Sequence, residues 1–298
     1  MLWPVDLLGN PSYASMVLGA IAEGRFEHTF VPLTIQAGGH TGVFRVSQDA
    51  LKIDGVRVNV TATLQQHVAD MLGGYLLTPK LLDQMWAQRA VTITPCTARS
   101  VVGMSTSAAM VKHSECVDDK LATAGGATES GIVQTVGKTW VITNALLDHP
   151  GKACNAGWHL EKPLGGEVPF DVAPTLQGAH MIQSPGYHHD FNWIDYSQIC
   201  LLVHRDCVID GKPTTFVDAA RNFWPLVSHE GVLRVLRQPG VPELVRPPET
   251  ASVQSGASTL ALTAIGASIG ASIAGTPGAL VGGAAGWALD AIRRKLLS

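Results

Sequence analysis

Titratable side chains are concentrated in one stretch of the sequence, YHHDFNWIDYSQICLLVHRD, which covers residues 187–206. Asp195 and Ser197 lie two positions apart in it, so on a strand both side chains would point to the same face. A nucleophilic serine needs a base within hydrogen-bond reach and a carboxylate that orients this base. His159 or His189 could supply the base, and Asp195 the carboxylate. The stretch therefore predicts a hydrolytic centre made of His159, His189, Asp195 and Ser197.

Two other interpretations of the same residues stay open. No GxSxG motif surrounds Ser197, so it could also be an ordinary serine in a partly buried strand. Histidine and carboxylate side chains are also the ligands of catalytic zinc, which keeps one position open for water. The adjacent His188, His189 and Asp190 make a divalent metal a possible cofactor, although the sequence has no HExxH motif.

Four further residues could bind a substrate. Lys138 and Asn144 flank the strand-like segment TWVIT, where they could present polar groups at its two ends. Trp158 could stack on a sugar or another ring through its π face. His113 lies close to Glu115 in a segment that we expect to be a loop. The alternatives are turn and capping roles for the polar residues and core packing for the tryptophan.

The hydrophobic pattern predicts an α+β fold in which a mixed β-sheet domain carries a helix pair. Residues 1–27 are expected to be an N-terminal helical segment, and residues 28–96 a β-β-α-α-β region. Residues 97–238 are expected to be a β-rich region that contains the candidate site, with one long strand through the DYSQ sequence.

Capping residues define the ends of the predicted helices. Asn10 is an acceptable N-cap for the first helix, and Thr61 can cap the second, which Gly73 would end. Thr78 precedes Pro79, which suits the first turn of a third helix. These signals delimit the helix pair between about residues 61 and 88.

The last part of the chain differs sharply in composition. A proline-rich linker covers residues 239–250, and the forty residues 250–289 carry no charge. In this tail, residues 251–298, Gly278, Gly282 and Gly286 repeat at every fourth position, which gives a helix a smooth face for close packing. Pro277 divides the uncharged segment, so we expect a glycine-zipper helical hairpin that associates through residues 256–289 with a membrane or with copies of itself. The expected oligomeric state is therefore a homo-oligomer.

The overall composition excludes some classes of protein. The chain has 298 residues, of which 46% are hydrophobic and 15% charged, so it can form a proper core. A net charge of −3 without a basic patch argues against a nucleic-acid partner. The five cysteines include no CxxC pair, so either one or two disulfides or buried free thiols are expected. The N-terminus does not have the pattern of a signal peptide.

The order of five motifs resembles that of an uncharacterised family of bacterial and phage-like proteins. The motifs are VADMLGGYLLTPKLLDQMWAQ (68–88), MVKHSE around His113, GKTWVITNALL (137–147), PGKACNAGWH (150–159) and HDFNWIDYSQ (189–198). The resemblance covers about residues 28–235 and implies no established activity. The family pattern ends in DYSHG, whereas this chain has Gln198 in place of the histidine. A ligand or base at that position would therefore be lost here.

These observations lead to two functional hypotheses. The first is a membrane-associated hydrolase of the cell envelope or virion, tethered by its tail, with a cell-wall polymer such as peptidoglycan as its partner. The second is a non-catalytic virion or envelope protein that oligomerises, or forms a membrane passage, through the same tail. The first hypothesis requires the predicted catalytic residues to converge, whereas the second requires only the tail.

Overall fold

The computed structural model describes residues 2–97, 103–125, 131–161, 173–174 and 180–244. The predicted glycine-zipper hairpin and the second half of the proline-rich linker lie outside these residues. Among the helices that are described, none is both long and apolar enough to cross a bilayer.

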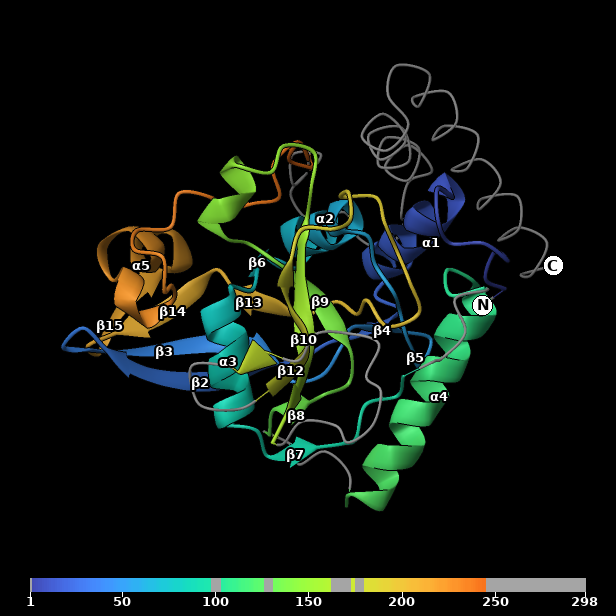
Figure 1. The fold of residues 1–298 in the computed structure, drawn as a ribbon, viewed down its shortest axis with the longest axis horizontal. Coiled ribbons are helices and arrows are strands. Elements are labelled where there is room, and N and C mark those ends of the chain that lie inside the picture. The colour runs from blue at the N-terminus through green and yellow to red at the C-terminus, as the bar shows by residue number, and fades with distance from the viewer. Residues whose placement is uncertain (1, 98–102, 126–130, 162–172, 175–179, 245–298) are drawn as a thin grey trace, which may run out of the picture.

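The described residues form an α+β fold, as the sequence predicts, with five α-helices and several separate sheets (Figure 1). The helices are α1 Pro11–Ala22, α2 Ala62–Leu72, α3 Pro79–Ala87, α4 Ser107–Thr123 and α5 Phe216–Asn222, with 3-10 helices η1 Asn144–Leu147 and η2 Trp224–Leu226. The strands are β1 Phe26–Glu27, β2 Phe30–Ala37, β3 His40–Ser47, β4 Lys52–Ile53, β5 Val56–Arg57, β6 Gly74–Leu76, β7 Val91–Thr92, β8 Val133–Gln134, β9 Lys138–Val141, β10 Cys154–Leu160, β11 Ala173–Pro174, β12 His180–Gly186, β13 Leu202–His204, β14 Asp206–Ile209 and β15 Lys212–Thr215.

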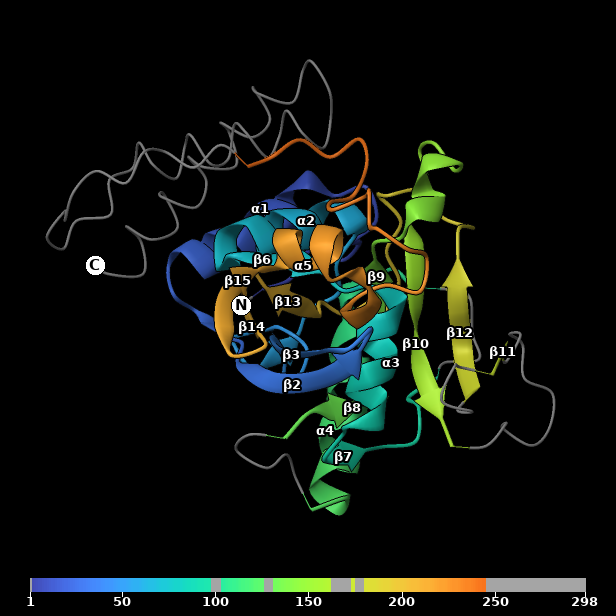
Figure 2. The same cartoon turned by 90° about the vertical axis from the view of Figure 1, so that its left-hand side faces the viewer.

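Two antiparallel sheets dominate the fold. The larger has the order β15-β14-β3-β13-β6, with β2 also paired to β3, and the smaller has the order β11-β12-β10-β9. Helix α3 contacts both sheets, and Figure 2 shows it between β2 and β10. A short sheet β1-β4-β5 and the parallel pair β7-β8 complete the described pairings. The smaller sheet and the segment that follows β12 carry most of the predicted site residues.

The predicted helix caps are confirmed. The Asn10 side chain accepts hydrogen bonds from the backbone of Ser12 and Tyr13 at the start of α1. Thr61 caps α2 by accepting from Leu64 N, and Gly73 ends this helix in the left-handed conformation with φ 67°. Thr78 caps α3, and Pro79 occupies its first position. These caps satisfy backbone groups that a helix end leaves unpaired.

The segment around His113 is helical, which corrects the expectation of a loop. Thr106 caps α4 by accepting a hydrogen bond from Ala109 N. The buried residues of this helix include Met110, His113, Val117 and Leu121, which recur at helical spacing. The buried histidine interrupts the apolar stripe, so the hydrophobic pattern alone underestimated the helix.

The long strand predicted through the DYSQ sequence is only partly present. Regular pairing begins at Leu202 in β13, whereas residues 195–201 contain a turn and isolated bridges. The reason is local, because the Asp195 carboxylate accepts a hydrogen bond from Ser197 N at 2.9 Å. Such an aspartate side chain replaces part of a strand ladder by a turn.

One hydrophobic core connects the predicted regions. It extends from Leu7, before α1, to Val235, after η2, and contains the fully buried Phe44, Trp140 and Phe216. The N-terminal segment, the helix pair and the β-rich region therefore pack as parts of one body. A smaller cluster of Trp158, Leu160, Ile182 and Tyr196 lies apart from this core and borders the candidate site.

Candidate functional site

Asp195 is the centre of a buried polar turn. Lys138 Nζ donates to its Oδ2 at 2.7 Å, and Ser197 donates to its Oδ1 from both Oγ (2.8 Å) and the backbone N (2.9 Å). The backbone N of Asp195 in turn donates to Gln198 Oε1 at 3.0 Å. We call these four residues, Lys138, Asp195, Ser197 and Gln198, the Asp195 turn. It brings Asp195 and Ser197 together through a turn and not through strand alternation.

The carboxylate of this turn is stabilised in its ionised form. Asp195 is 2% exposed and Lys138 6%, so the pair is almost completely removed from water. Burial by itself would raise the pKa of Asp195, but the Lys138 ammonium and the Ser197 hydrogen bonds outweigh it and hold this pKa below its ordinary value. The result is a fixed carboxylate–ammonium pair beside a serine hydroxyl.

Two glycines allow the backbone segments of this turn to approach each other. A Cβ atom on Gly157 would lie 2.6 Å from Lys138 Cα, and one on Gly137 would lie 2.7 Å from the carbonyl oxygen of Ser197. Lys138 N also donates to that Ser197 oxygen at 2.9 Å. The GK and GWH motifs therefore place Lys138 by means of their glycines, since any larger residue would separate the strands.

Two uncharged histidines lie near the turn. The His113 ring meets the Tyr196 ring edge-on at 5.4 Å, and burial, followed by the charge of Arg57, lowers the pKa of His113 to about 4. His189 is half-buried and stacks on Trp193 at 4.6 Å. Burial, followed by the charge of Lys138, lowers the pKa of His189, whereas Asp195 opposes this shift. Both rings are therefore predominantly neutral at pH 7 and able to accept a proton.

Several buried polar atoms around Tyr196 make no hydrogen bond to any residue that the structure describes. They are His113 Nε2, Trp158 Nε1, Gln198 Nε2 and Asn59 Oδ1. Trp158 faces the Tyr196 ring at 6.5 Å, and Asn59 Nδ2 donates to the Tyr196 carbonyl oxygen at 2.9 Å. An unsatisfied buried polar group costs about 1–3 kcal/mol, so four of them in one neighbourhood are available to a polar ligand or an ordered water.

His159 lies away from this turn, contrary to the prediction that it serves Ser197. Its Nε2 contacts Asp83 Oδ1 at 2.8 Å, and its ring stacks on Trp86 of α3 at 5.7 Å. The neighbouring Trp158 points to Tyr196, because consecutive residues of β10 face opposite sides of the sheet. The sequence spacing therefore placed a histidine near the turn, but the strand directs it to the opposite face.

Asn144 supports a loop and does not present a free amide to a substrate. Its Nδ2 donates to the Val232 carbonyl oxygen at 2.9 Å, and its Oδ1 accepts from Arg234 N at 2.7 Å. Its backbone N donates to Glu230 Oε2 at 2.7 Å. Asn144 thus holds the segment around residues 230–234 against the end of β9.

The predicted metal ligands are used differently. The His189 ring stacks on Trp193, and Asp190 Oδ1 accepts a hydrogen bond from Asn192 N at 2.8 Å. In the part of the chain that the structure describes, no three histidine, cysteine, aspartate or glutamate side chains are grouped to hold a metal ion.

Sequence reasoning missed the residues that complete these contacts. Asn59 and Asp83 lie far from the DYSQ sequence along the chain, and only the fold brings them to Tyr196 and His159. Asp83 is the fifth residue of α3 and lies beyond its first turn, so it does not have the usual place of an acidic residue at a helix start. No local signal in the sequence indicates its contact with a histidine from another element.

No family model, curated protein or solved structure matches this chain. The resemblance to the uncharacterised bacterial and phage-like family therefore stays a prediction.

Proposed function

We propose that the protein is a hydrolase of the cell envelope, with peptidoglycan as the expected polymer and the Asp195 turn as its reaction centre. The observation that carries this proposal is the convergence of six predicted site residues. Lys138, Asp195 and Ser197 are hydrogen-bonded to each other. The other three lie around them: Trp158 and His113 at the Tyr196 ring, and His189 within electrostatic reach of Lys138 and Asp195.

His189 is the proposed general base, because it is neutral and the only half-buried group among these residues. It would take a proton from a water whose oxygen attacks the carbon of a glycosidic or amide bond. The bond to the leaving group then breaks, and the leaving atom takes the proton from the His189 imidazolium, which returns this histidine to its neutral form. Lys138 and Asp195 are buried and hydrogen-bonded to each other, so they would act through His189: the Asp195 carboxylate favours the imidazolium that forms, and Lys138 keeps the resting ring neutral.

Ser197 has a positioning role in this proposal and is not the nucleophile. It is fully buried, and its hydroxyl already donates to the Asp195 carboxylate at 2.8 Å. A serine nucleophile would need a histidine at that hydroxyl, and the histidine predicted for this task, His159, contacts Asp83 instead.

A disulfide supports the proposed location outside the cytosol. Cys96, which follows β7, is bonded to Cys116 of α4. Disulfides form and persist mainly in oxidising compartments such as the periplasm, the cell surface and the virion. The uncharged tail, residues 250–289, would hold the folded part close to a membrane.

The proposal is tested with the full chain on purified peptidoglycan, by zymography and by release of soluble fragments. We expect His189→Ala to reduce fragment release by about 100-fold or more, since a general base contributes on the order of 10²–10⁴. His188→Ala is the matched control, because His188 is the exposed neighbour and should leave activity unchanged. If the folded wild-type protein releases no fragments, peptidoglycan hydrolysis is ruled out as its function. Activity lost on addition of a chelator would assign the chemistry to a metal.

A non-catalytic envelope or virion protein is the second candidate. The closed, fully hydrogen-bonded state of Ser197 and the glycine repeats of the tail favour it. In this case the Asp195 turn would only stabilise the fold, and self-association through residues 256–289 would be the function. Light scattering in detergent then shows an oligomer that Gly278→Leu and Gly282→Leu dissociate, while His189→Ala has no effect on any activity.

A further inference from the structure

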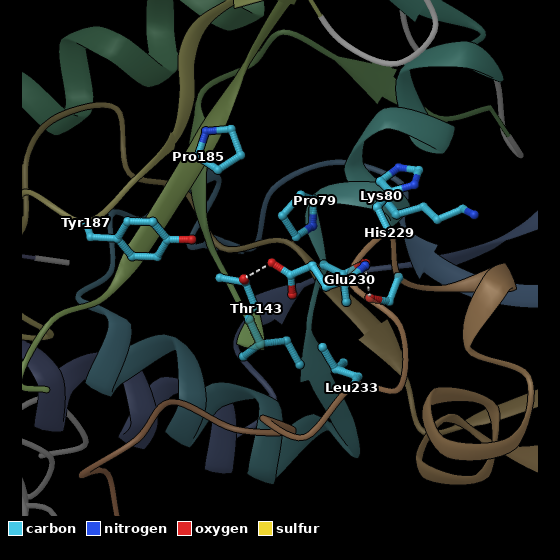
Figure 3. A pocket seen from close by; sticks show the side chains of 11 residues that line it. Pro79, Lys80, Thr143, Pro185, Tyr187, His229, Glu230 and Leu233 are labelled. Carbon is cyan, nitrogen blue, oxygen red and sulfur yellow. Dashed lines mark hydrogen bonds between the residues drawn. The ribbon is translucent and has the colours of Figure 1, made fainter. Parts of the chain in front are cut away.

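A pocket of about 160 Å³ opens to solvent between the start of α3, the end of β12 and residues 228–233 (Figure 3). It is distinct from the Asp195 turn, with which it shares no residue. Its lining consists of Thr78, Pro79, Lys80, Ile142, Thr143, Pro185, Tyr187, Ser228, His229, Glu230 and Leu233. A water molecule takes about 30 Å³ in the liquid, so the pocket has room for one amino-acid-sized group.

Glu230 presents a carboxylate at a fixed position in this pocket. Thr143 Oγ1 donates to its Oε1, and Asn144 N donates to its Oε2 at 2.7 Å. Asn144 also holds the following residues through Val232 and Arg234. An ionised carboxylate has about four acceptor positions, so Glu230 keeps free lone pairs for a ligand.

Part of the pocket lining is aromatic and apolar. Figure 3 shows Tyr187 and Pro185 on the side opposite Glu230, and Pro79 on the same side as Glu230. The Tyr187 ring stacks on His149 at 4.4 Å with an interplanar angle of 10°, so its orientation is defined. Burial, followed by the neighbouring Cys154 thiol, raises the pKa of Tyr187 to about 12, so its hydroxyl is uncharged at pH 7. This part of the lining suits a short aliphatic side chain.

Two basic side chains lie beyond Glu230 on the side away from Tyr187. Lys80 Nζ donates to the Pro225 carbonyl oxygen, which uses one of the three protons of the ammonium. His229 Nε2 lies 3.9 Å from Asp83 Oδ2, and Asp83 is in turn held by His159. The pocket thus offers an acceptor at Glu230 and donors at Lys80 and His229.

We propose that this pocket binds a small zwitterion, namely a free amino acid or a dipeptide whose amine and carboxylate both lie in the pocket. The amine binds Glu230, the carboxylate binds Lys80 and His229, and the aliphatic part packs on Pro79 and Tyr187. Binding rests on the pocket alone and does not require the Asp195 turn to be catalytic. If both proposals hold, the pocket binds the peptide part of the polymer.

The probe is the dipeptide Ala-Ala, compared by calorimetry with N-acetyl-Ala-Ala, which lacks the amine, and Ala-Ala-amide, which lacks the carboxylate. We expect the full-length protein to bind Ala-Ala. We expect it to bind each blocked peptide at least about tenfold more weakly than Ala-Ala, because a charged group of the pocket then loses its partner. Equal binding of all three peptides, or no binding of Ala-Ala by the folded protein, overturns the proposal. This comparison uses the unaltered chain, so it does not depend on a variant being folded.

Two substitutions assign the ends of the ligand. Glu230→Gln keeps an oxygen for Thr143 but should abolish the preference for Ala-Ala over N-acetyl-Ala-Ala. Lys80→Met should abolish the preference over Ala-Ala-amide. Glu27→Gln and Lys212→Met are the matched controls, since both residues are exposed and lie outside the pocket. Unchanged preferences in both pocket variants would overturn the assignment. Because His189→Ala leaves the pocket intact, loss of peptide binding and loss of hydrolysis are distinguishable.

Discussion

At the scale of single residues, the Asp195 turn depends on the mutual compensation of two buried charges. Lys138 Nζ and Asp195 Oδ2 are 2.7 Å apart, and both side chains are nearly inaccessible to water. A buried pair of this kind adds little net stability compared with apolar residues, but either charge left alone is costly. The pair therefore defines the conformation of the turn and the positions of its charges, but it adds little to the free energy of unfolding.

This pairing predicts an asymmetry between single and double variants. Lys138→Met leaves the Asp195 carboxylate buried without its cation and should lower the free energy of unfolding by about 3–5 kcal/mol. Lys138→Met combined with Asp195→Asn removes both charges and should be less destabilised than Lys138→Met alone. Urea denaturation at pH 7 measures all three proteins. A double variant that is at least as destabilised as Lys138→Met alone would contradict a coupled pair.

At the scale of elements, the glycines of two motifs decide how closely β9 and β10 approach. Gly157 lies at φ 154° and directly faces Lys138 Cα, so β10 could not pair with β9 in this register if residue 157 had a Cβ. Gly151 also has a positive φ, 77°, but a Cβ there would meet no atom within 4 Å. A side chain at position 151 would meet only the cost of an unfavourable φ, whereas one at position 157 would also clash with β9.

Alanine substitution of these glycines should give unequal losses. Gly151→Ala should cost about 1–2 kcal/mol, the usual penalty of a left-handed conformation for a residue with a Cβ. Gly157→Ala should cost more than about 3 kcal/mol, because β10 must move away from β9. It should also weaken the Asp195 turn through Lys138. Thermal and urea unfolding of both variants provide the comparison, and similar losses would show that the contact at Lys138 relaxes easily.

The elements that sequence predicts well are those whose signals are local. Asn10, Thr61 and Thr78 each cap a helix through a side chain and a backbone group three residues apart or less, so their roles are visible in the sequence. The contacts of His159 and Asn144 depend on partners 76 and 88 positions away. Their positions beside predicted strands indicate that these two polar residues are part of the ordered fold. They do not indicate which element each residue contacts.

At the scale of the whole molecule, one core joins segments from Leu7 to Val235, and it encloses ionisable groups that are neutral at pH 7. His67 of α2 is fully inaccessible, and His113 of α4 is 4% exposed. Burial is the main cause that lowers the pKa of each to about 4, with Arg237 acting on His67 and Arg57 on His113 in the same direction. The unfolded chain, by contrast, protonates both residues near pH 6.5.

The two histidines make the stability of the whole molecule dependent on pH. Between pH 6.5 and about 4 the unfolded state binds more protons than the folded state, so the free energy of unfolding falls as the pH falls through this window. Each histidine contributes a loss on the order of 3 kcal/mol at most, at up to about 1.4 kcal/mol per pH unit. Urea denaturation at pH 7, 5.5 and 4.5 measures this loss of free energy of unfolding. His113→Gln removes one of the two histidines, so it should reduce the slope of the free energy of unfolding against pH by the contribution of one bound proton. An unchanged slope in this variant, with the folded state intact at pH 7, would mean that water reaches His113 and that the neighbourhood of Tyr196 is open to solvent.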